Sequence, residues 1–293
     1  MCKINPRVDF AFKLIFGNEQ NKDILISLLN AILEDYQTCP IESIEILNPL
    51  GSKEYSKDKL TILDIKAKDQ KGEFYNIEMQ ISDQYYYQKR ALYYWSRLYT
   101  SQISEGIGYQ NLTRTVSINI LNFNAIKEKD YHNVYRVREL KQNTDLTDHL
   151  EIHFIELDKF TKELPDIKRT MDRWIYFLKH AEKFTETNLP EPLKEIKPIE
   201  KANVILDRIS LNKEQREIYE ARLKSLRDAD GALQTARIRG LEEGIEKGIE
   251  QGKEAGKKEE KIETARKLFK KKFSVEEICE ITGLSEDEIK KIK

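Results

Sequence analysis

The sequence predicts an α/β fold with a mixed sheet, followed by a helical C-terminal extension. Segments of strand character alternate with segments of helical spacing up to Pro190. Their order is a helix, three strands, a helix and a strand, which is typical of α/β proteins. After Pro190, Pro192 and Pro198 the chain becomes highly charged and helical in pattern.

The individual elements follow from periodicity and from turn residues. Apolar residues at helical spacing predict a first helix over residues 18–33. Strands are expected over residues 41–48, 60–68, 73–81, 115–123, 133–138 and 150–157. A long helix is expected over residues 83–105, with Ser82 or Asp83 as N-cap and Gly106 in the left-handed conformation at its end. A further helix is expected around residues 168–184.

The same patterns divide the chain into four segments: a main domain (1–189), a Pro-rich linker (190–198), a charged helical segment (199–272) and a small pair of helices (273–293). The charged segment has glycine at every fourth position from Gly240 to Gly256. Each glycine costs about 0.8–1 kcal/mol relative to alanine in a helix, but a glycine stripe also permits close helix–helix approach. Two interpretations stay open: a mobile tail, or a homo-oligomer formed through the C-terminal helices.

Composition excludes several classes of protein. The 293 residues include 50 Lys+Arg and 51 Asp+Glu, so the chain has no overall positive field, and any polyanion site has to be local. No apolar run approaches the roughly 20 residues of a membrane span, and the N-terminus lacks the apolar region of a secretory signal. Three scattered cysteines show neither disulfide nor metal-site spacing. We therefore expect a cytoplasmic protein without membrane contact.

Residues 60–81 carry the candidate site. Asp69-Gln70-Lys71-Gly72 indicates a hairpin turn, with a three-residue loop that ends on a left-handed Gly72. This turn sets a register in which directly opposed residues share one face of the sheet. One face is then apolar, and the other carries Asp64, Lys66, Asn76, Glu78 and Gln80.

The register places Asp64 opposite Glu78. Like charges directly opposite each other are destabilising, which favours a cation between the two carboxylates. Carboxylate oxygens are typical ligands of Mg²⁺, and the metal would polarise a phosphoryl oxygen and lower the pKa of a bound water. Lys66 would neutralise charge on the phosphate or orient the water. The alternative is a half-exposed hairpin whose polar face contacts water.

Three blocks of sequence, in order, resemble a known nuclease family. They are DFAFKLIFG (9–17), LDIKAKDQKGEFYNIEMQ (63–80) and KRALYYWSRLYTSQISEGIGYQNL (89–112). Together they resemble the recombination-promoting nuclease group, also described as PD-(D/E)XK nuclease family transposases. The resemblance implies a restriction-endonuclease-like αβββαβ core and a metal-dependent DNA endonuclease linked to recombination or mobile DNA.

The resemblance also implies roles for particular residues. Asp64 and Glu78 would bind Mg²⁺, with Mn²⁺ as a substitute, and the backbone carbonyl of Met79 is a further candidate ligand. Gln80 stands where the broader superfamily has its lysine. Because glutamine supplies no positive charge, we assign that role to Lys66. An additional acid from the first helix is common in the superfamily, and Asp9 is favoured over Glu19.

The helix after the hairpin carries candidate DNA contacts. Arg90, Tyr94 and Arg97 share one helical face at i, i+4, i+7 spacing. Contacts from this face to phosphates would position DNA without reading its sequence. Most aromatic rings of this helix are expected to pack against the sheet, and Arg90 is the favoured candidate for a function near the metal.

The competing interpretation is a catalytically silent DNA-binding or oligomerising protein on the same fold. Residues 273–293 resemble the last two helices of a helix-turn-helix unit. However, Glu286, Asp287 and Glu288 begin the final helix, where acidic side chains would repel DNA. We therefore expect a small cap packed on the long helix. The four histidines show no ligand spacing and are expected in the core or on the surface.

Overall fold

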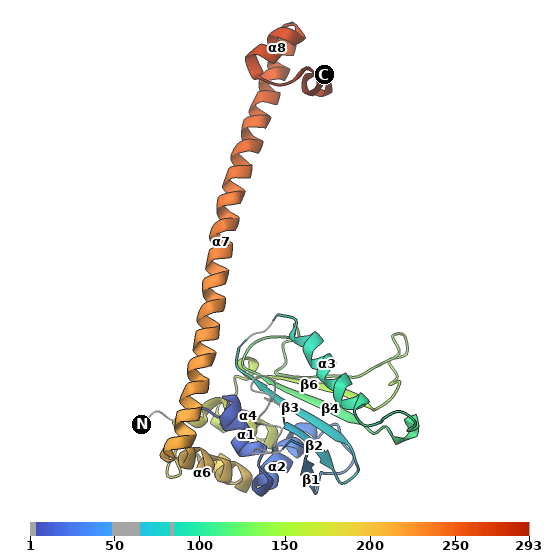
Figure 1. Ribbon diagram of the computed structural model, residues 1–293, viewed down its shortest axis with the longest axis vertical. Coiled ribbons are helices and arrows are strands. Elements are labelled where there is room, and N and C mark those ends of the chain that lie inside the picture. Colours follow the sequence, from blue (N-terminus) through green and yellow to red (C-terminus); the bar gives the residue numbers. More distant parts are fainter. Residues whose placement is uncertain (1–3, 49–64, 83–84, 293) are drawn as a thin grey trace. The chain divides into compact units, whose positions relative to one another are not determined.

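The computed structural model of the chain describes residues 4–48, 65–82 and 85–292. It divides into two compact units, Met1–Arg227 and Asp228–Lys293. The first unit is built on a six-stranded mixed sheet (Figure 1). Its strands are β1 (Ile44–Ile46), β2 (Ile65–Asp69), β3 (Phe74–Gln80), β4 (Thr115–Leu121), β5 (His132–Tyr135) and β6 (Leu150–Glu156).

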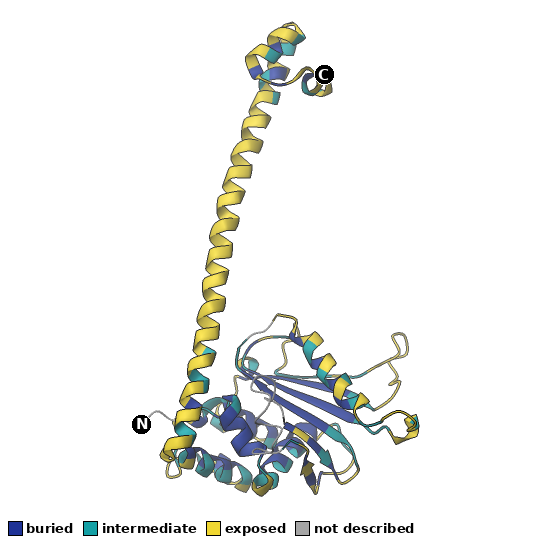
Figure 2. Cartoon of the chain, in the orientation of Figure 1, coloured by how far each residue is buried: buried dark blue, intermediate teal, exposed yellow. Residues whose placement is uncertain are grey.

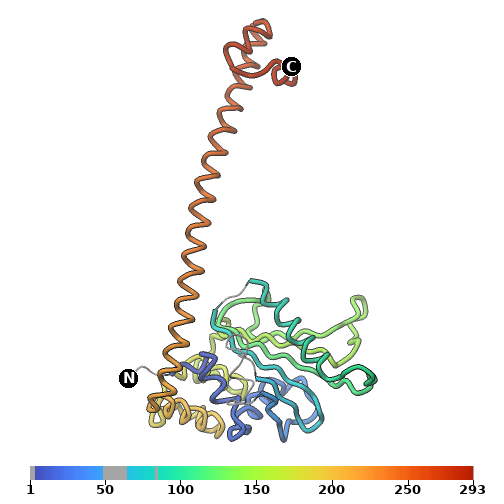
Figure 3. Tube along the Cα trace, in the orientation of Figure 1, coloured from blue at the N-terminus to red at the C-terminus, as the bar shows by residue number. Residues whose placement is uncertain are grey.

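The strand order is β1-β2-β3-β4-β6-β5. The first three strands are antiparallel neighbours, β3, β4 and β6 run parallel, and β5 returns antiparallel to β6. The chain passes from β3 through helix α3 (Tyr87–Thr100) back to β4 (Figure 3). Such a crossover is what parallel neighbours require. The predicted α/β fold with a mixed sheet is confirmed.

Helices lie on both faces of the sheet (Figure 1). One face shares a large apolar core with α1 (Asp9–Phe16), α2 (Lys22–Leu33), α4 (Thr170–His180), α5 (Glu191–Lys194) and α6 (Lys197–Leu211). Helix α3 packs on the other face, against β3, β4 and β6. Helix α1 was not among the predicted helices. After Asp9 it is buried on every side, and a helix without a polar stripe shows no helical periodicity.

The hairpin between β2 and β3 forms as predicted. Gly72 has φ +82°, and its N–H donates to the Asp69 carbonyl at 3.0 Å. Lys66 lies opposite Asn76, as the three-residue loop requires. The register is therefore confirmed for the described pairs, and Asp64 lies outside the described residues.

The two faces of β3 separate as predicted, but both are buried. Tyr75, Ile77 and Met79 belong to the large core. Asn76, Glu78 and Gln80, on the opposite face, are also almost fully buried. The alternative of a polar face in contact with water is therefore excluded for these three residues. Only the long-range packing of the chain decides this, because alternation alone does not show what covers a face.

Helix α3 is shorter than the predicted 83–105. It begins directly after Tyr86, whose φ is +66°, and it ends at Thr100. The hydroxyls of Thr100 and Ser101 donate to carbonyls within the last turn. The Gln102 side chain then pairs with Thr113 and draws the chain toward β4. Gly106 does adopt a left-handed conformation, but in the loop beyond the helix.

The three prolines expected to mark a linker begin helices. Pro190 is the N-cap of α5, Pro192 lies in its first turn, and Pro198 lies in the first turn of α6. Proline suits these positions because the N–H groups there have no intrahelical partner. Leu193 and Ile199 are fully buried in the large core. The first unit therefore continues past residue 189 to Arg227.

The second unit consists of most of α7 (Lys213–Lys270) with α8 (Val275–Thr282) and α9 (Glu286–Ile292). From Asp228 onward α7 is exposed along most of its length (Figure 2). Its last turns share a small core with the two short helices, formed by Ala265, Ile278, Leu284 and Ile289. No helix in the described part of the chain is long and apolar enough to cross a membrane.

Candidate active site

A buried layer of polar side chains lies between the sheet and α3. Strand β3 contributes Asn76, Glu78 and Gln80, and β4 contributes Ser117 and Asn119. Neighbours in the parallel register, such as Glu78 and Asn119, necessarily share this face. Burying an ionisable group is costly unless it is paired or hydrogen-bonded. The partners of Glu78 therefore define the site.

The Glu78 carboxylate is held from both the strand and the helix. The Tyr87 hydroxyl lies 3.2 Å from Oε2, and Asn76 Nδ2 donates to Oε1 at 3.3 Å. The Tyr87 hydroxyl also lies 3.1 Å from Asn119 Oδ1. Arg90 Nη2 lies 3.7 Å from Glu78 Oε2, with side-chain exposures of 25% and 3% respectively. The site is thus a carboxylate under a helix, with the Arg90 guanidinium at its edge.

Burial raises the pKa of Tyr87 well above its ordinary value, and the nearby Glu78 charge raises it further. The phenol therefore stays protonated and can donate to only one acceptor at a time. Its two candidate acceptors are Glu78 and Asn119. Tyr87 consequently links β3, β4 and α3 at one point.

The backbone before α3 directs this tyrosine inward. Tyr86 adopts a left-handed conformation, which is uncommon for a bulky residue and marks local strain. The chain then enters the helix with Tyr87 buried and Tyr86 exposed. Arg90 follows one turn later on the Tyr87 side, and its guanidinium also lies over the Tyr94 ring at 5.1 Å.

Two buried polar atoms of the layer have no hydrogen-bond partner among the described residues. They are Asn76 Oδ1 and Gln80 Nε2. Gln80 directs its carbonyl to Asn122 beyond β4, so alternation along the strand turns the Met79 carbonyl toward β2. Near Glu78 the chain thus offers a carboxylate, an unpaired amide oxygen and a carbonyl. This donor set fits a hard, oxygen-liganded cation.

The other predicted site residues are placed differently. Lys66 lies on the face of Glu78 but is exposed, and Arg97 is exposed near the end of α3. The Asp9 carboxylate accepts from the Phe10 N–H and lies 3.5 Å from Arg222, and helix α1 packs in the large core on the other face of the sheet. Within the described ranges, no three His, Cys, Asp or Glu side chains are placed to hold a metal ion.

A second polar cluster lies on the opposite face and was not predicted. His153 Nε2 lies 2.7 Å from Glu151 Oε1, and His153 Nδ1 lies 2.9 Å from His132 Nε2. Arg114 and Arg136 also bind the Glu151 carboxylate. Spacing could not reveal this group, because its members come from different strands and loops.

Burial sets the protonation of this cluster. Burial lowers the pKa of His153. Burial, together with the neighbouring His153, lowers the pKa of His132 to about 3. Burial would raise the pKa of Glu151, but His153, Arg114 and Arg136 outweigh it and lower that pKa to about 2. The histidines are therefore neutral and Glu151 is ionised. A surface cavity of about 410 Å³ adjoins His132.

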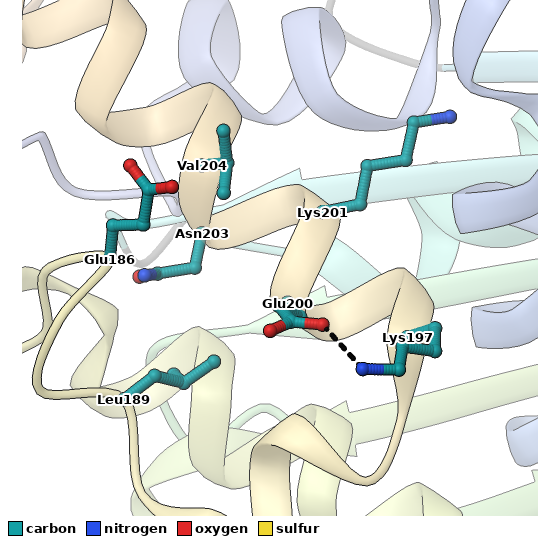
Figure 4. A pocket seen from close by; sticks show the side chains of 7 residues that line it. All are labelled: Glu186, Leu189, Lys197, Glu200, Lys201, Asn203 and Val204. Carbon is teal, nitrogen blue, oxygen red and sulfur yellow. Dashed lines mark hydrogen bonds and ion pairs between the residues drawn. The ribbon is translucent and has the colours of Figure 1, made fainter.

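Another cavity, of about 310 Å³, lies beside α6 (Figure 4). Lys197 and Glu200 form an ion pair of 2.9 Å at its rim. None of its lining residues belongs to β3, β4 or α3. This cavity is therefore separate from the polar layer around Glu78.

The mixed sheet, the β2–β3 hairpin and a buried glutamate under the crossover helix together define a PD-(D/E)XK nuclease-like fold. Residues 6–236 match the family described as PD-(D/E)XK nuclease family transposase, and the chain belongs to that family. The match includes the whole sheet, α1 to α6 and the beginning of α7. No curated protein and no solved structure matches the chain. The family indicates a nuclease-type function, and PD-(D/E)XK nucleases generally use divalent metal ions.

Proposed function

We propose that this protein is a metal-dependent DNA endonuclease that hydrolyses backbone phosphodiesters. The observation that carries the proposal is the Glu78 carboxylate, almost fully buried yet flanked by Arg90 and by an unpaired amide oxygen. A fold that only needed a stable core would not retain a charged group there, because an apolar side chain avoids the cost of desolvation.

Glu78 and Asp64 would hold Mg²⁺, with the Met79 carbonyl as a further ligand and Mn²⁺ as a substitute. When bound, the ion would polarise the phosphoryl oxygen and lower the pKa of a water molecule. Tyr87 and Asn76 orient the Glu78 carboxylate through hydrogen bonds. Lys66 supplies positive charge toward the phosphate, and the Gln80 amide orients the attacking water. Stabilising charge and positioning reactants are the main contributions a protein makes to such a reaction.

Cleavage of supercoiled plasmid DNA in Mg²⁺ tests this proposal. The wild type should nick or linearise the plasmid, and Asp64→Ala and Glu78→Gln should each lose that activity. Equal cleavage by the wild type and both variants would reject the assignment. Thermal unfolding of each variant serves as the folding control.

The competing function is a silent DNA-binding or oligomerising protein. Calorimetric titration with Mn²⁺ separates the two, since a silent protein would bind DNA without binding the ion. A further role in moving mobile DNA would require strand joining in addition to cleavage, measured with labelled donor and target DNA.

We also propose that α7 associates with a second copy of the chain. Leu241, Ile245 and Ile249 each follow a glycine of the repeat and are more than half exposed. Helices in proteins gain most of their stability from packing an apolar face against another element. A second copy of the chain would provide such packing for α7.

A further inference from the structure

Three tyrosine rings on α3 and directly before it are exposed to solvent. Tyr85 is 91% exposed, Tyr86 is 63% exposed and Tyr93 is 56% exposed. The rings of Tyr85 and Tyr86 contact each other edge to face, with centroids 5.2 Å apart. Tyr86 is held outward by its left-handed backbone, which is costly for a bulky residue. These rings therefore contribute nothing to the core that would explain their position.

Cations accompany these rings. Lys89 Nζ lies 4.8 Å from the centroid of the Tyr86 ring, and Arg97 is exposed farther along the helix. Residues 85–104 include Lys89, Arg90 and Arg97 but neither Asp nor Glu, although the chain as a whole has 51 acids and 50 bases. This surface is thus a local positive patch on a nearly neutral protein. Its charge is complementary to a polyanion.

The patch is continuous with the candidate active site. Tyr87, next to the exposed pair in sequence, contacts Glu78, and Arg90 connects the stripe to the same carboxylate. Along α3, Lys89 and Arg90 each lie three or four residues from Tyr93, and Tyr93 lies four residues before Arg97, so these residues form one stripe that begins beside Tyr86. A strand bound along this stripe would pass beside Glu78.

We propose that Tyr85, Tyr86 and Tyr93 stack on unpaired bases, so that the substrate is DNA with a single-stranded segment next to the cleaved phosphate. This inference rests on the proposed nuclease function. In a duplex the base faces are covered by their neighbours, and only an unpaired base offers its face to a ring. Exposed aromatic rings interleaved with cations are the arrangement that binds single strands without sequence preference.

Binding without divalent metal tests the proposal. Fluorescence anisotropy would compare a labelled oligothymidylate with a duplex of equal length, in EDTA. The double variant Tyr85→Ala/Tyr86→Ala and the single variant Tyr93→Ala should each lose at least about fivefold in affinity for the single strand, the effect of one lost base stack. Affinity for the duplex should change much less. Tyr86→Phe should bind like the wild type, because phenylalanine keeps the ring.

Tyr109→Ala is the matched control, because Tyr109 is 82% exposed but lies beyond the end of α3. It should bind the single strand like the wild type. Unchanged single-strand affinity in the Tyr85 and Tyr93 variants would overturn the proposal, and so would an equal loss for single strand and duplex. A fall in the sedimenting mass of these variants would show instead that the rings contact a second copy, which also overturns it.

Failure of the single-strand binding proposal can be distinguished from failure of the nuclease assignment. The binding assay contains no metal and measures no cleavage, so a catalytically silent protein could still show the predicted loss. Conversely, plasmid cleavage that depends on Glu78 would support the nuclease even if the tyrosine variants bound single strands normally.

Discussion

Arg90 on helix α3 lies 3.7 Å from the carboxylate of Glu78 on strand β3, and this pair joins the crossover helix to the polar face of the sheet. Its two members differ in environment, since Glu78 is almost fully buried whereas Arg90 reaches solvent. The pair therefore connects a buried carboxylate to the positive surface of α3. Its removal should affect both stability and activity.

Replacing Arg90 by alanine should leave the Glu78 charge with less compensation. We expect a loss of about 1–3 kcal/mol in the free energy of unfolding, between the values for exposed and buried pairs. Plasmid cleavage should fall as well. Chemical denaturation and the cleavage assay measure the two effects. Arg97→Ala, an exposed cation of the same helix, should leave stability within about 0.5 kcal/mol of the wild type. An equal loss of stability in the Arg90 and Arg97 variants would contradict a specific role for the pair of Arg90 and Glu78.

Replacing Tyr87 by phenylalanine should remove the hydroxyl shared by Glu78 and Asn119. Because both acceptors are buried, we expect a loss of about 1–3 kcal/mol in the free energy of unfolding. The affinity for Mn²⁺, measured by calorimetry, should also change, since the carboxylate loses one of its orienting contacts. Tyr93→Phe removes an exposed hydroxyl from the same helix and should alter neither quantity. Identical behaviour of the two variants would refute an orienting role for Tyr87.

Mild acid should destabilise the protein through the neutral histidines His132 and His153. His132 has a pKa of about 3 in the folded chain, far below the ordinary value of 6.5, and the pKa of His153 is also lowered. The unfolded chain therefore takes up protons that the folded chain does not, so stability falls as the pH drops below 6.5 toward 3. Glu151, with a pKa of about 2 instead of 4.5, adds to the loss only under more acidic conditions.

Denaturation midpoints at about pH 7 and about pH 5 measure this effect. His132→Phe should show a smaller difference between the two conditions, since it removes one of the histidines whose pKa is lowered in the folded chain. His149→Phe, which alters a histidine outside the Glu151 cluster, should keep the wild-type difference. A pH-independent midpoint in the wild type would contradict the neutral state of the pair.

Gly72→Ala should weaken the hairpin that positions β3. The φ of +82° at Gly72 costs an ordinary L-residue roughly 1–2 kcal/mol. We expect a loss of that size in the free energy of unfolding, measured by chemical denaturation. Gly72→Asn is the matched variant, because asparagine tolerates the left-handed conformation, and it should lose clearly less. If the two variants were equally destabilised, a steric clash of the added side chain, and not the backbone conformation, would be the cause.

Replacing Ile245 and Ile249 by glutamate should dissociate any pair of α7 helices. The two side chains are exposed in the single chain, so the change should leave the unfolding of the first unit unaltered. Analytical ultracentrifugation should show a decrease in mass relative to the wild type. Glu246→Gln is the control, since it alters a polar residue of the same turn. A wild type that sediments as a monomer at all concentrations would refute self-association.

The hairpin shows what local sequence can determine. Its register depends on one turn and on the alternation of neighbouring residues, so Gly72 and the pairing of Lys66 with Asn76 were predictable. Arg90 was also predicted near the site, on the helix that follows the hairpin. In contrast, α1 and the short helix α5 escaped prediction, since their environment is set by the core they enter.

The chain sequence by itself determined which residues of β3 share a face, because the side-chain period of a strand is a local property. Only the tertiary structure decided that this face is buried under α3, and that the Tyr87 hydroxyl lies between Glu78 and Asn119. The reason is physical: partners from other segments of the chain meet only when the crossover helix packs on the sheet. The same holds for His132, His153 and Glu151, which the pairing of β5 with β6 and the burial of that face bring together.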